Sequence, residues 1–449
     1  MIKIERVNNR PVYDITVNKN HNFYANNILV HNCAEIVEAT GVTEFGKEIL
    51  KDKAKLESLG LGEFWGQEEV NETAVCNLAS IALPKFINKN KTYNFNKLYD
   101  IAYDAIINLN NVIDVNYYPS PAAKFSNLCH RPVGLGVQGL ADVFFTLGIA
   151  YESDEAKQLN KEIFETIYYA SIKASCDLAK TQGTYASYEG SPISQGKFQY
   201  DLWGTKPSKR WDWEKLREEV KKYGVRNSLT TCIMPTASTA SILGNEASCE
   251  AQTSNMYTRS VLSGTFILVN KYLVKELVKL GLWNEGLRKK IIGENGSVQN
   301  IPEIPTNLKE IFKTVYEIKQ RDVIEMAAER GAFIDQTQSM NIFMESPNFA
   351  KLTAMHFYGW GRRNLMQDEQ GQPIIPQGEN IQVIYDENGS PKCYRDKRYT
   401  LKTGIYYLRN KSAADAVKFT VQETKTIEEQ MAEISCSLDS PEDCISCGS

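Results

Sequence analysis

The chain has 449 residues, enough for two to four domains of roughly 100–200 residues each. Hydrophobic residues make up 42% and charged residues 24% of the sequence, which excludes a disordered or fibrous protein. The 51 basic and 55 acidic residues give a net charge of −4, too balanced to indicate a surface for nucleic acid or anionic membrane.

No apolar run reaches the ~18 residues of a membrane span, and the N-terminus lacks the apolar core of a signal peptide. We therefore expect a cytoplasmic protein. In a reducing compartment, the ten cysteines favour thiol chemistry or metal binding over structural disulfides.

The first 32 residues differ from the rest in their pattern of apolar and polar residues. They carry short β-type runs, Ile2–Ile4, Pro11–Val17 and Asn22–Val30, separated or broken by Asn-Asn pairs. Such runs predict short strands and turns, and hence a small all-β element at 1–32.

From Cys33 onward, helical patterns alternate with strand-like apolar pieces at 133–137 and 229–234, which predicts an α/β architecture. One helix carries an apolar face from Leu98 to Ile113, and a second begins after Ser153 and ends at Gly183. A third helix is predicted to end at Gly331 and to carry Ile311, Val315, Ile318, Val323 and Met326.

Two stretches interrupt this pattern. Residues 41–72 are polar and predict a surface excursion. Residues 361–402 contain an Asn388-Gly389 turn between strand-like pieces at 381–385 and 392–399, which predicts a protruding hairpin. The last stretch, 436–449, has little to bury and predicts a mobile tail.

The end of the first element has a chemical pattern of its own. Val12-Tyr13-Asp14-Ile15, His21-Asn22-Phe23 and Ile28-Leu29-Val30-His31-Asn32, followed by Cys33, together resemble the C-terminal part of an intein. In such a segment, the Asn32 side-chain amide can attack its own carbonyl and cut the bond to Cys33. His31 would act as acid or base for that step, and the Cys33 thiol would accept an acyl group.

The resemblance further implies that His21 supports the Asn32 step and that Asp14 belongs to the splicing centre. The tripeptide His31-Asn32-Cys33 alone could be a chance loop sequence, but the match covers all of 1–32. Because an upstream intein half is missing from this chain, we expect a split intein whose partner chain carries that half.

The chain from Cys33 onward contains seven sequence motifs. From residue 33 the chain resembles the large (alpha) subunit of class I ribonucleotide reductase, on the motifs Cys33-Ala34-Glu35-Ile36-Val37-Glu38, Ala74–Ser80, His130–Asp142, Met234–Ala240, Ala328–Phe333, Met355–Trp360 and Gly404–Arg409. The resemblance implies the second half of a ten-stranded α/β barrel over 33–435, including the radical-cysteine loop, with a redox tail at 436–449.

The resemblance assigns roles to individual residues. Cys33 would form the thiyl radical that abstracts the 3′-hydrogen, and Glu35 would take the 3′-hydroxyl proton. Cys76 would be one of the two thiols that become a disulfide, and Tyr406-Tyr407 would relay the radical. Out of context, Glu35 would be a solvated surface charge and the tyrosine pair ordinary strand packing.

Two further motifs leave alternatives open. Pro235-Thr236-Ala237-Ser238-Thr239 follows an apolar strand and could cradle a diphosphate at a helix N-terminus or serve as an N-capping cluster. Cys444 and Cys447 form a close dithiol suited to thiol exchange; zinc binding with Cys436 would lack a fourth ligand. The remaining cysteines, Cys129, Cys176, Cys232, Cys249 and Cys393, have no motif-based role.

These expectations combine into one hypothesis. After trans-splicing to an N-terminal half, the chain would be the large subunit of ribonucleoside-diphosphate reductase and would form a homodimer, with Cys33 serving first in splicing and then in catalysis. It would bind no cofactor or metal itself, receive its radical from a metal-containing small (beta) subunit, and be re-reduced by thioredoxin or glutaredoxin. The alternative is a module that docks on the N-terminal half without splicing.

Overall fold

The computed structural model describes residues 22–25, 28–31, 40–261, 264–345, 347–402 and 407–411. The described chain divides into two compact units. Unit 1 comprises the residues up to Thr253 together with Val315–Lys411, and unit 2 comprises Ser254–Thr314.

Parallel strands form the centre of unit 1. Strand β5 (Asn77–Ala82) pairs in parallel with β6 (Val133–Gln138), and every residue of β6 is buried. Single parallel bridges then join Leu135 to Thr231 and Ile233 to Gln338. Parallel strands in chain order, with helices between them, agree with the predicted α/β architecture.

A further parallel pair in unit 1 joins β9 (Asn341–Met344) to β15 (Tyr407–Asn410).

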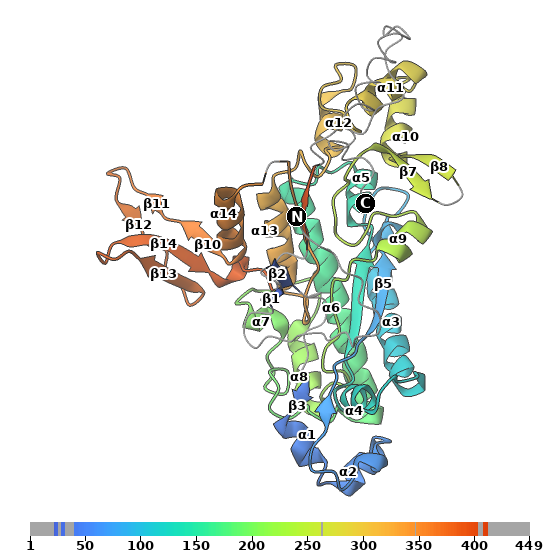
Figure 1. The fold of residues 1–449 in the computed structure, drawn as a ribbon, viewed down its shortest axis with the longest axis vertical. Helices are drawn as coiled ribbons and strands as arrows, with labels where there is room; N and C mark the ends of the chain where they lie inside the picture. Colours follow the sequence, from blue (N-terminus) through green and yellow to red (C-terminus); the bar gives the residue numbers. More distant parts are fainter. Residues whose placement is uncertain are drawn as a thin grey trace. The chain divides into compact units, whose positions relative to one another are not determined.

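Long helices pack against these strands in unit 1. Helices α3 (Phe95–Val115) and α6 (Asp154–Gln182) contact each other along their lengths, and α3 contacts β5 and β6 (Figure 1). Both helices were predicted. Ser153 Oγ accepts a hydrogen bond from Ala156 N, and Gly183 ends α6 at φ +75°, as the cap residues indicated.

Shorter helices complete this part of unit 1. They are α4 (Pro121–His130), α5 (Leu140–Leu147), α7 (Gln199–Leu202), α8 (Trp213–Tyr223) and α9 (Ala237–Leu243).

The stretch 41–72, predicted as a surface excursion, is folded into short strands and helices. It forms β3 (Gly41–Val42), α1 (Glu44–Ile49), α2 (Lys53–Ser58) and β4 (Asn71–Glu72). Its few apolar residues gather in a small core of their own, which includes Leu56, Leu61 and Phe64 and packs on Phe125 of α4.

The predicted helix over 311–331 is wrong in its middle. Helix α12 (Thr306–Ile311) ends before it and α13 (Gln320–Gly331) begins after it. Between them Val315 N donates to Gln252 O, and the Gln320 side chain donates to the carbonyls of Val315 and Ile318. Helix-like spacing arose there because Phe312, Val315 and Ile318 are buried from an irregular segment.

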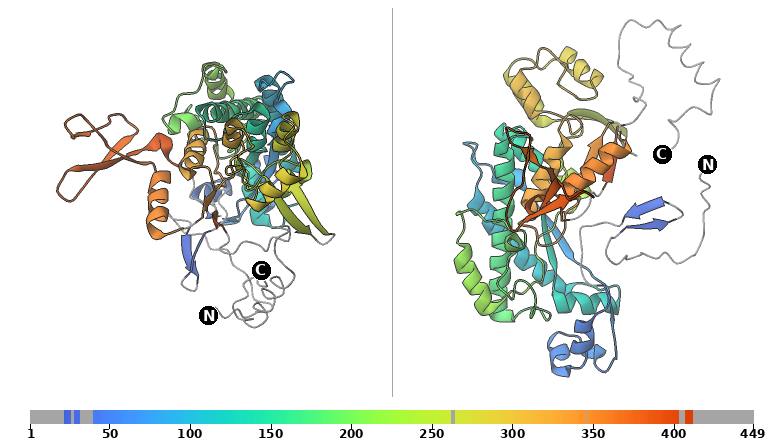
Figure 2. Two further views of the ribbon diagram at one scale, coloured as in Figure 1. Left: turned by 90° about the horizontal axis from the view of Figure 1, so that it is seen from above. Right: turned by 90° about the vertical axis from the view of Figure 1, so that its left-hand side faces the viewer.

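The hairpin predicted in 361–402 is confirmed. Strands β13 (Ile381–Tyr385) and β14 (Pro391–Asp396) are antiparallel around Gly389, which has φ +80°. Strand β10 (Arg362–Asn364) pairs with the other edge of β14, and β11 (Met366–Gln367) pairs with β12 (Pro373–Ile374). We call residues 361–402 the hairpin module; with helix α14 (Phe349–Gly359) it stands out from the rest of unit 1 (Figures 1 and 2).

Unit 2 is built from an antiparallel hairpin and three helices. Strands β7 (Met256–Val261) and β8 (Gly264–Val269) pair with each other, and the helices are α10 (Lys271–Lys279), α11 (Glu285–Gly293) and α12. Asn255 fastens this unit internally, because its side-chain amide donates to the carbonyls of Gly296 and Phe312.

Within the segment 1–32, the described residues form one antiparallel pair, β1 (Asn22–Ala25) with β2 (Ile28–His31). The turn expected at Asn26-Asn27 itself lies outside the described residues. The strand-like runs at 2–4 and 11–17 lie outside the described residues. None of the helices that the structure describes has the length and apolar character required to cross a membrane.

Candidate functional site

Cys76 lies directly before β5 and is partly exposed. Its sulfur lies over Gly134 of the neighbouring strand, where an added Cβ would come within 3.3 Å of Cys76 Sγ and 2.6 Å of Cys232 Sγ. Only glycine therefore leaves room for the two sulfur atoms at this position of β6. Cys232, predicted to have no motif-based role, is fully buried at this point.

Gln336 contacts Cys76 from the segment that pairs with residues 231–233. Gln336 Nε2 donates to Val133 O at 2.8 Å and to Cys76 Sγ at 3.6 Å. Gln336 was not predicted from the sequence, because a glutamine in the run Asp335-Gln336-Thr337-Gln338 fits no ligand or nucleophile pattern. The available signal was two glutamines at alternate positions directly after a buried apolar stretch.

A cavity of about 300 Å³ lies between β5 and the start of α9. Leu78, Ala79 and Ser80 line one side of it, while Met234 and Thr236–Thr239 line the other. Cys76 precedes this lining stretch of β5 by two residues. The predicted diphosphate loop therefore lies across the cavity from β5, the strand that the predicted redox cysteine directly precedes.

The N-capping alternative for this loop is wrong for Thr236, the N-cap residue of α9. Thr236 has a left-handed backbone (φ +52°), and its side chain makes no cap bond to α9. Instead, Thr236 Oγ1 accepts from Ser248 N at 2.8 Å, and Thr239 Oγ1 donates to Thr236 O at 3.2 Å. Ser238 is exposed at the cavity. The loop is thus held in shape by Ser248 from outside the helix and by Thr239 from within it, and the Thr236 side chain does not cap the first amides of α9.

Buried charges flank the segment that carries Gln336. Burial raises the pKa of the Asp335 carboxyl, against the hydrogen bonds that Asp335 accepts from Thr230 and Thr231. Burial also lowers the pKa of the Lys402 ammonium to about 7. Lys402 Nζ donates to the carbonyls of Ile334 and Gln336, so this lysine ties the 334–336 backbone to the chain that leads toward Tyr406.

The structure reaches only part of the predicted site. Tyr407 is in β15 and is 48% exposed, and the backbone of His31 is in β2. The other predicted residues lie outside the described residues: Asp14, His21, Asn32, Cys33, Glu35, Tyr406, Cys444 and Cys447. The described site is therefore Cys76, Gln336 and the 235–239 loop. Over that described part, no group of three or more His, Cys, Asp or Glu side chains could hold a metal ion.

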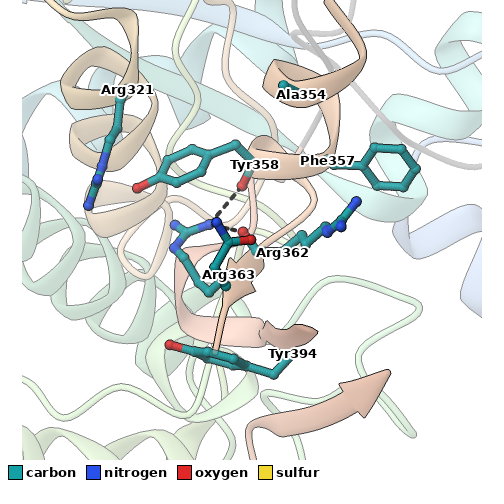
Figure 3. A pocket seen from close by; sticks show the side chains of 8 residues that line it. Arg321, Ala354, Phe357, Tyr358, Arg362, Arg363 and Tyr394 are labelled. Carbon is teal, nitrogen blue, oxygen red and sulfur yellow. Dashed lines mark hydrogen bonds between the residues drawn. The ribbon is translucent and has the colours of Figure 1, made fainter. Parts of the chain in front are cut away.

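A second cavity, of about 550 Å³, lies where α13 and α14 meet the hairpin module (Figure 3). Its lining combines cationic and aromatic side chains. The Arg363 guanidinium lies 3.8 Å from the Tyr358 ring centroid, and its Nη1 donates to Tyr358 O at 3.0 Å. Arg321 and Tyr358 both contact Glu325 of α13. These contacts fasten the module to the helices.

Comparison with known proteins identifies the class. The family model "Ribonucleotide reductase, barrel domain" matches residues 4–363. The chain belongs to this family. The matched range begins within the segment 1–32 and ends in the first strand of the hairpin module.

Individual relatives agree with the family. The ribonucleoside-diphosphate reductase large subunit of Arabidopsis thaliana is 47% identical over 414 residues, covering 84% of this chain and 46% of the relative. The large chain of Schizosaccharomyces pombe is 51% identical over 351 residues, covering 78% and 39%. The Actinobacillus ureae class Id ribonucleotide reductase alpha subunit is a structural match, with 30% identity, coverage of 64% of this chain and 47% of that chain, and a TM-score of 0.49. The chain spans less than half the length of these curated relatives.

Proposed function

We propose that this chain supplies the C-terminal part of a ribonucleoside-diphosphate reductase large subunit, which reduces ribonucleotides to deoxyribonucleotides by thiyl-radical chemistry. One observation carries this proposal. Thr236–Thr239 line one side of a cavity of about 300 Å³, and Leu78–Ser80 of β5, the strand that Cys76 directly precedes, line the other. A nucleoside diphosphate bound there would have its phosphates at the start of α9 and a thiol close to its sugar.

In this proposal, Cys76 gives up its thiol hydrogen and forms a disulfide as the substrate is reduced. Its partner thiol belongs to the N-terminal half. The 3′-hydrogen would be abstracted by a thiyl radical on Cys33, with Glu35 taking the 3′-hydroxyl proton. Tyr406 and Tyr407 would relay the radical from a metal-containing small subunit. The Cys444–Cys447 dithiol would then reduce the Cys76 disulfide by exchange and be restored by thioredoxin or glutaredoxin.

We also propose that residues 1–32 join this chain to its N-terminal half by trans-splicing. The spliced product would act as a homodimer in the cytoplasm. Asn32 would cyclise with help from His31 and His21, with Asp14 at the splicing centre, and Cys33 would accept the incoming acyl group. The dual use of Cys33 gives a reason for this junction, because a reductase cannot lose its radical cysteine.

Mass measurement after mixing the chain with a candidate N-terminal half tests the splicing proposal. A ligated chain together with a released peptide of residues 1–32 supports it. An unchanged, non-covalently associated pair supports the docking module instead and refutes splicing. Asn32→Ala should block release of the 1–32 peptide, and normal ligation in that variant would contradict the role of Asn32.

Turnover tests the reductase proposal separately. The joined protein, mixed with the small subunit, a dithiol reductant and a ribonucleoside diphosphate, should form the deoxyribonucleotide. Cys76→Ser should abolish multiple turnover with the dithiol, since serine cannot form the disulfide. Wild-type turnover in Cys76→Ser would contradict the role of Cys76, and turnover by the unjoined chain would contradict the need for its other half.

A further inference from the structure

Gln336 occupies a fixed position inside the sheet of unit 1. Its side chain is 3% exposed, and its backbone N donates to Thr231 O at 3.0 Å. Its backbone carbonyl accepts from Lys402 Nζ at 3.0 Å. The backbone is thus held from both sides, so the side-chain amide has little freedom in where it can point.

The contacts of the amide define which end faces the sulfur. Val133 O can only accept a hydrogen bond, so the group 2.8 Å from it must be the Gln336 Nε2. The same nitrogen is 3.6 Å from Cys76 Sγ. Gln336 Oε1 is buried and has no hydrogen-bond partner within the described ranges. The amide is therefore positioned through its two N–H groups, one on a carbonyl and one on a sulfur.

We propose that Gln336 is a positioning residue for Cys76, which holds the sulfur beside Gly134 and stabilises its thiolate. An N–H donor favours the charged form of an acceptor that can lose a proton. This inference rests on the proposed redox role of Cys76 and adds a function for a side chain that lies outside the substrate cavity.

A stabilised Cys76 thiolate should make the proposed disulfide between Cys76 and its partner thiol easier to reduce. A dithiol reductant attacks the partner sulfur as a thiolate, forms a new S–S bond to it, and breaks its bond to Cys76. The electron pair of the broken bond leaves on Cys76 Sγ, which becomes a thiolate and later takes a proton from solvent. Because a better stabilised thiolate leaves faster, the Gln336 N–H should accelerate this step.

The same residue contacts the chain that leads to the tyrosine pair. Lys402, which donates to the Gln336 carbonyl, precedes Tyr406 by four residues. Gln336 thus contacts Cys76 through its side chain and Lys402 through its backbone carbonyl. A substitution at Gln336 would therefore change the surroundings of the Cys76 thiol, although Gln336 lines neither of the two cavities.

The test measures alkylation of Cys76 by iodoacetamide across pH 6–10 in the full chain, resolved by peptide mass spectrometry. Gln336→Met, which keeps the size but removes the donor, should raise the midpoint of the Cys76 profile by about one pH unit. Gln336→Glu should raise it further, because a carboxylate would face the thiolate. Gln338→Met is the matched control: Gln338 is equally buried in the same segment, but its amide bonds Arg330 and Ala327 O.

Circular dichroism first establishes that each variant is folded. A midpoint that stays at the wild-type value in a folded Gln336→Met or Gln336→Glu chain overturns the proposal, as does an equal shift in Gln338→Met. If Gln336→Met does not fold, Gln336→Ala, which also removes the donor without adding a charge, decides between the two outcomes. Alkylation requires no turnover, so failure of the joined protein to reduce nucleotides would count against the proposed function and leave this result intact.

Discussion

The strands around Cys76 and the hairpin module are both β structures of unit 1, yet they are held in opposite ways. Strand β6 is buried along its whole length, and its neighbours approach so closely that Gly134 and Gly136 have no room for a side chain. In β13 and β14 most residues are partly exposed. The module is fastened at its base by cation–aromatic contacts such as Arg363 on Tyr358.

This difference separates a region that tolerates no added volume from one that depends on a few surface contacts. Close packing transmits any change in volume to the neighbouring strands, so the sulfur of Cys76 has a defined position. The module is turned by its own Asn388-Gly389 pair, with Gly389 at φ +80°. It lies almost wholly beyond the family match, which ends at residue 363. We therefore expect substitutions in the first region to affect the whole unit and those in the second to act locally.

The largest expected effect is that of Gly136→Ala. A Cβ at this position would lie 2.6 Å from the backbone carbonyl of Cys232 and 2.6 Å from Met234 Sδ. Since the carbonyl belongs to the adjacent strand and cannot rotate away, we expect a loss of about 3 kcal/mol in the free energy of unfolding. Urea denaturation followed by circular dichroism measures it.

Gly389→Ala in the module is the matched comparison. Nothing lies within 4 Å of its added Cβ, but φ is +80°, so the cost is backbone strain alone, about 1 kcal/mol. Equal losses in the two variants would mean that the strands near Cys76 can relax, and the contrast between the two regions would fail.

An effect smaller than that of Gly136→Ala is expected for Glu325→Gln at the junction of α13 with α14. Glu325 accepts from Lys157 Nζ at 2.9 Å, from Arg321 Nε at 3.0 Å and from Tyr358. Burial raises the pKa of this carboxyl, but the three donors outweigh burial and lower it to about 2. Loss of the charge should cost about 2 kcal/mol at pH 7.

The stabilisation by the Glu325 carboxylate should decrease as the pH falls. A carboxyl whose pKa is lowered by folding stabilises the fold above its unfolded pKa of about 4.3, and this contribution disappears as the pH falls toward 2. The wild-type and Glu325→Gln urea midpoints should therefore converge between pH 4 and pH 2. Glu329→Gln, one turn further along α13, is the control. Burial raises the pKa of Glu329, so its substitution should not destabilise the chain at pH 7, and a loss equal to that of Glu325→Gln would contradict this account.

Much of the local structure was predictable from residues that strongly prefer a helix end or a turn. Ser153 and Gly183 bound α6 as expected, and Asn388-Gly389 marked the turn of the module. The helix expected across 312–319 failed because buried residues in an irregular segment can repeat at helical spacing. Tertiary contacts decided that segment, through bonds such as that from Val315 N to Gln252 O.

The candidate site was predictable where a motif names the residue, as for Cys76 and Thr236. Gln336 was not, because its contact with Cys76 spans 260 positions of the chain and depends on how three strand segments align. Sequence patterns report chemistry carried by neighbouring residues. They do not report which distant amide a fold will bring to a sulfur.

The smallest expected effect is that of Arg363→Ala at the base of the module. The Arg363 guanidinium stacks on Tyr358, lies 5.1 Å from the Tyr399 ring centroid and donates to two carbonyls, so its loss should cost about 1 kcal/mol. Because the contacts with Tyr358 join the module to α14, we expect a local opening in which amides of β13 and β14 exchange about fivefold faster, while those of β6 keep their rates. Arg362→Ala, which loses only a 5.3 Å contact with the Phe357 ring, should leave both sets unchanged. Faster exchange in β6 after Arg363→Ala would show that the module is coupled to the strands beside Cys76, and the separation between the two regions would not hold.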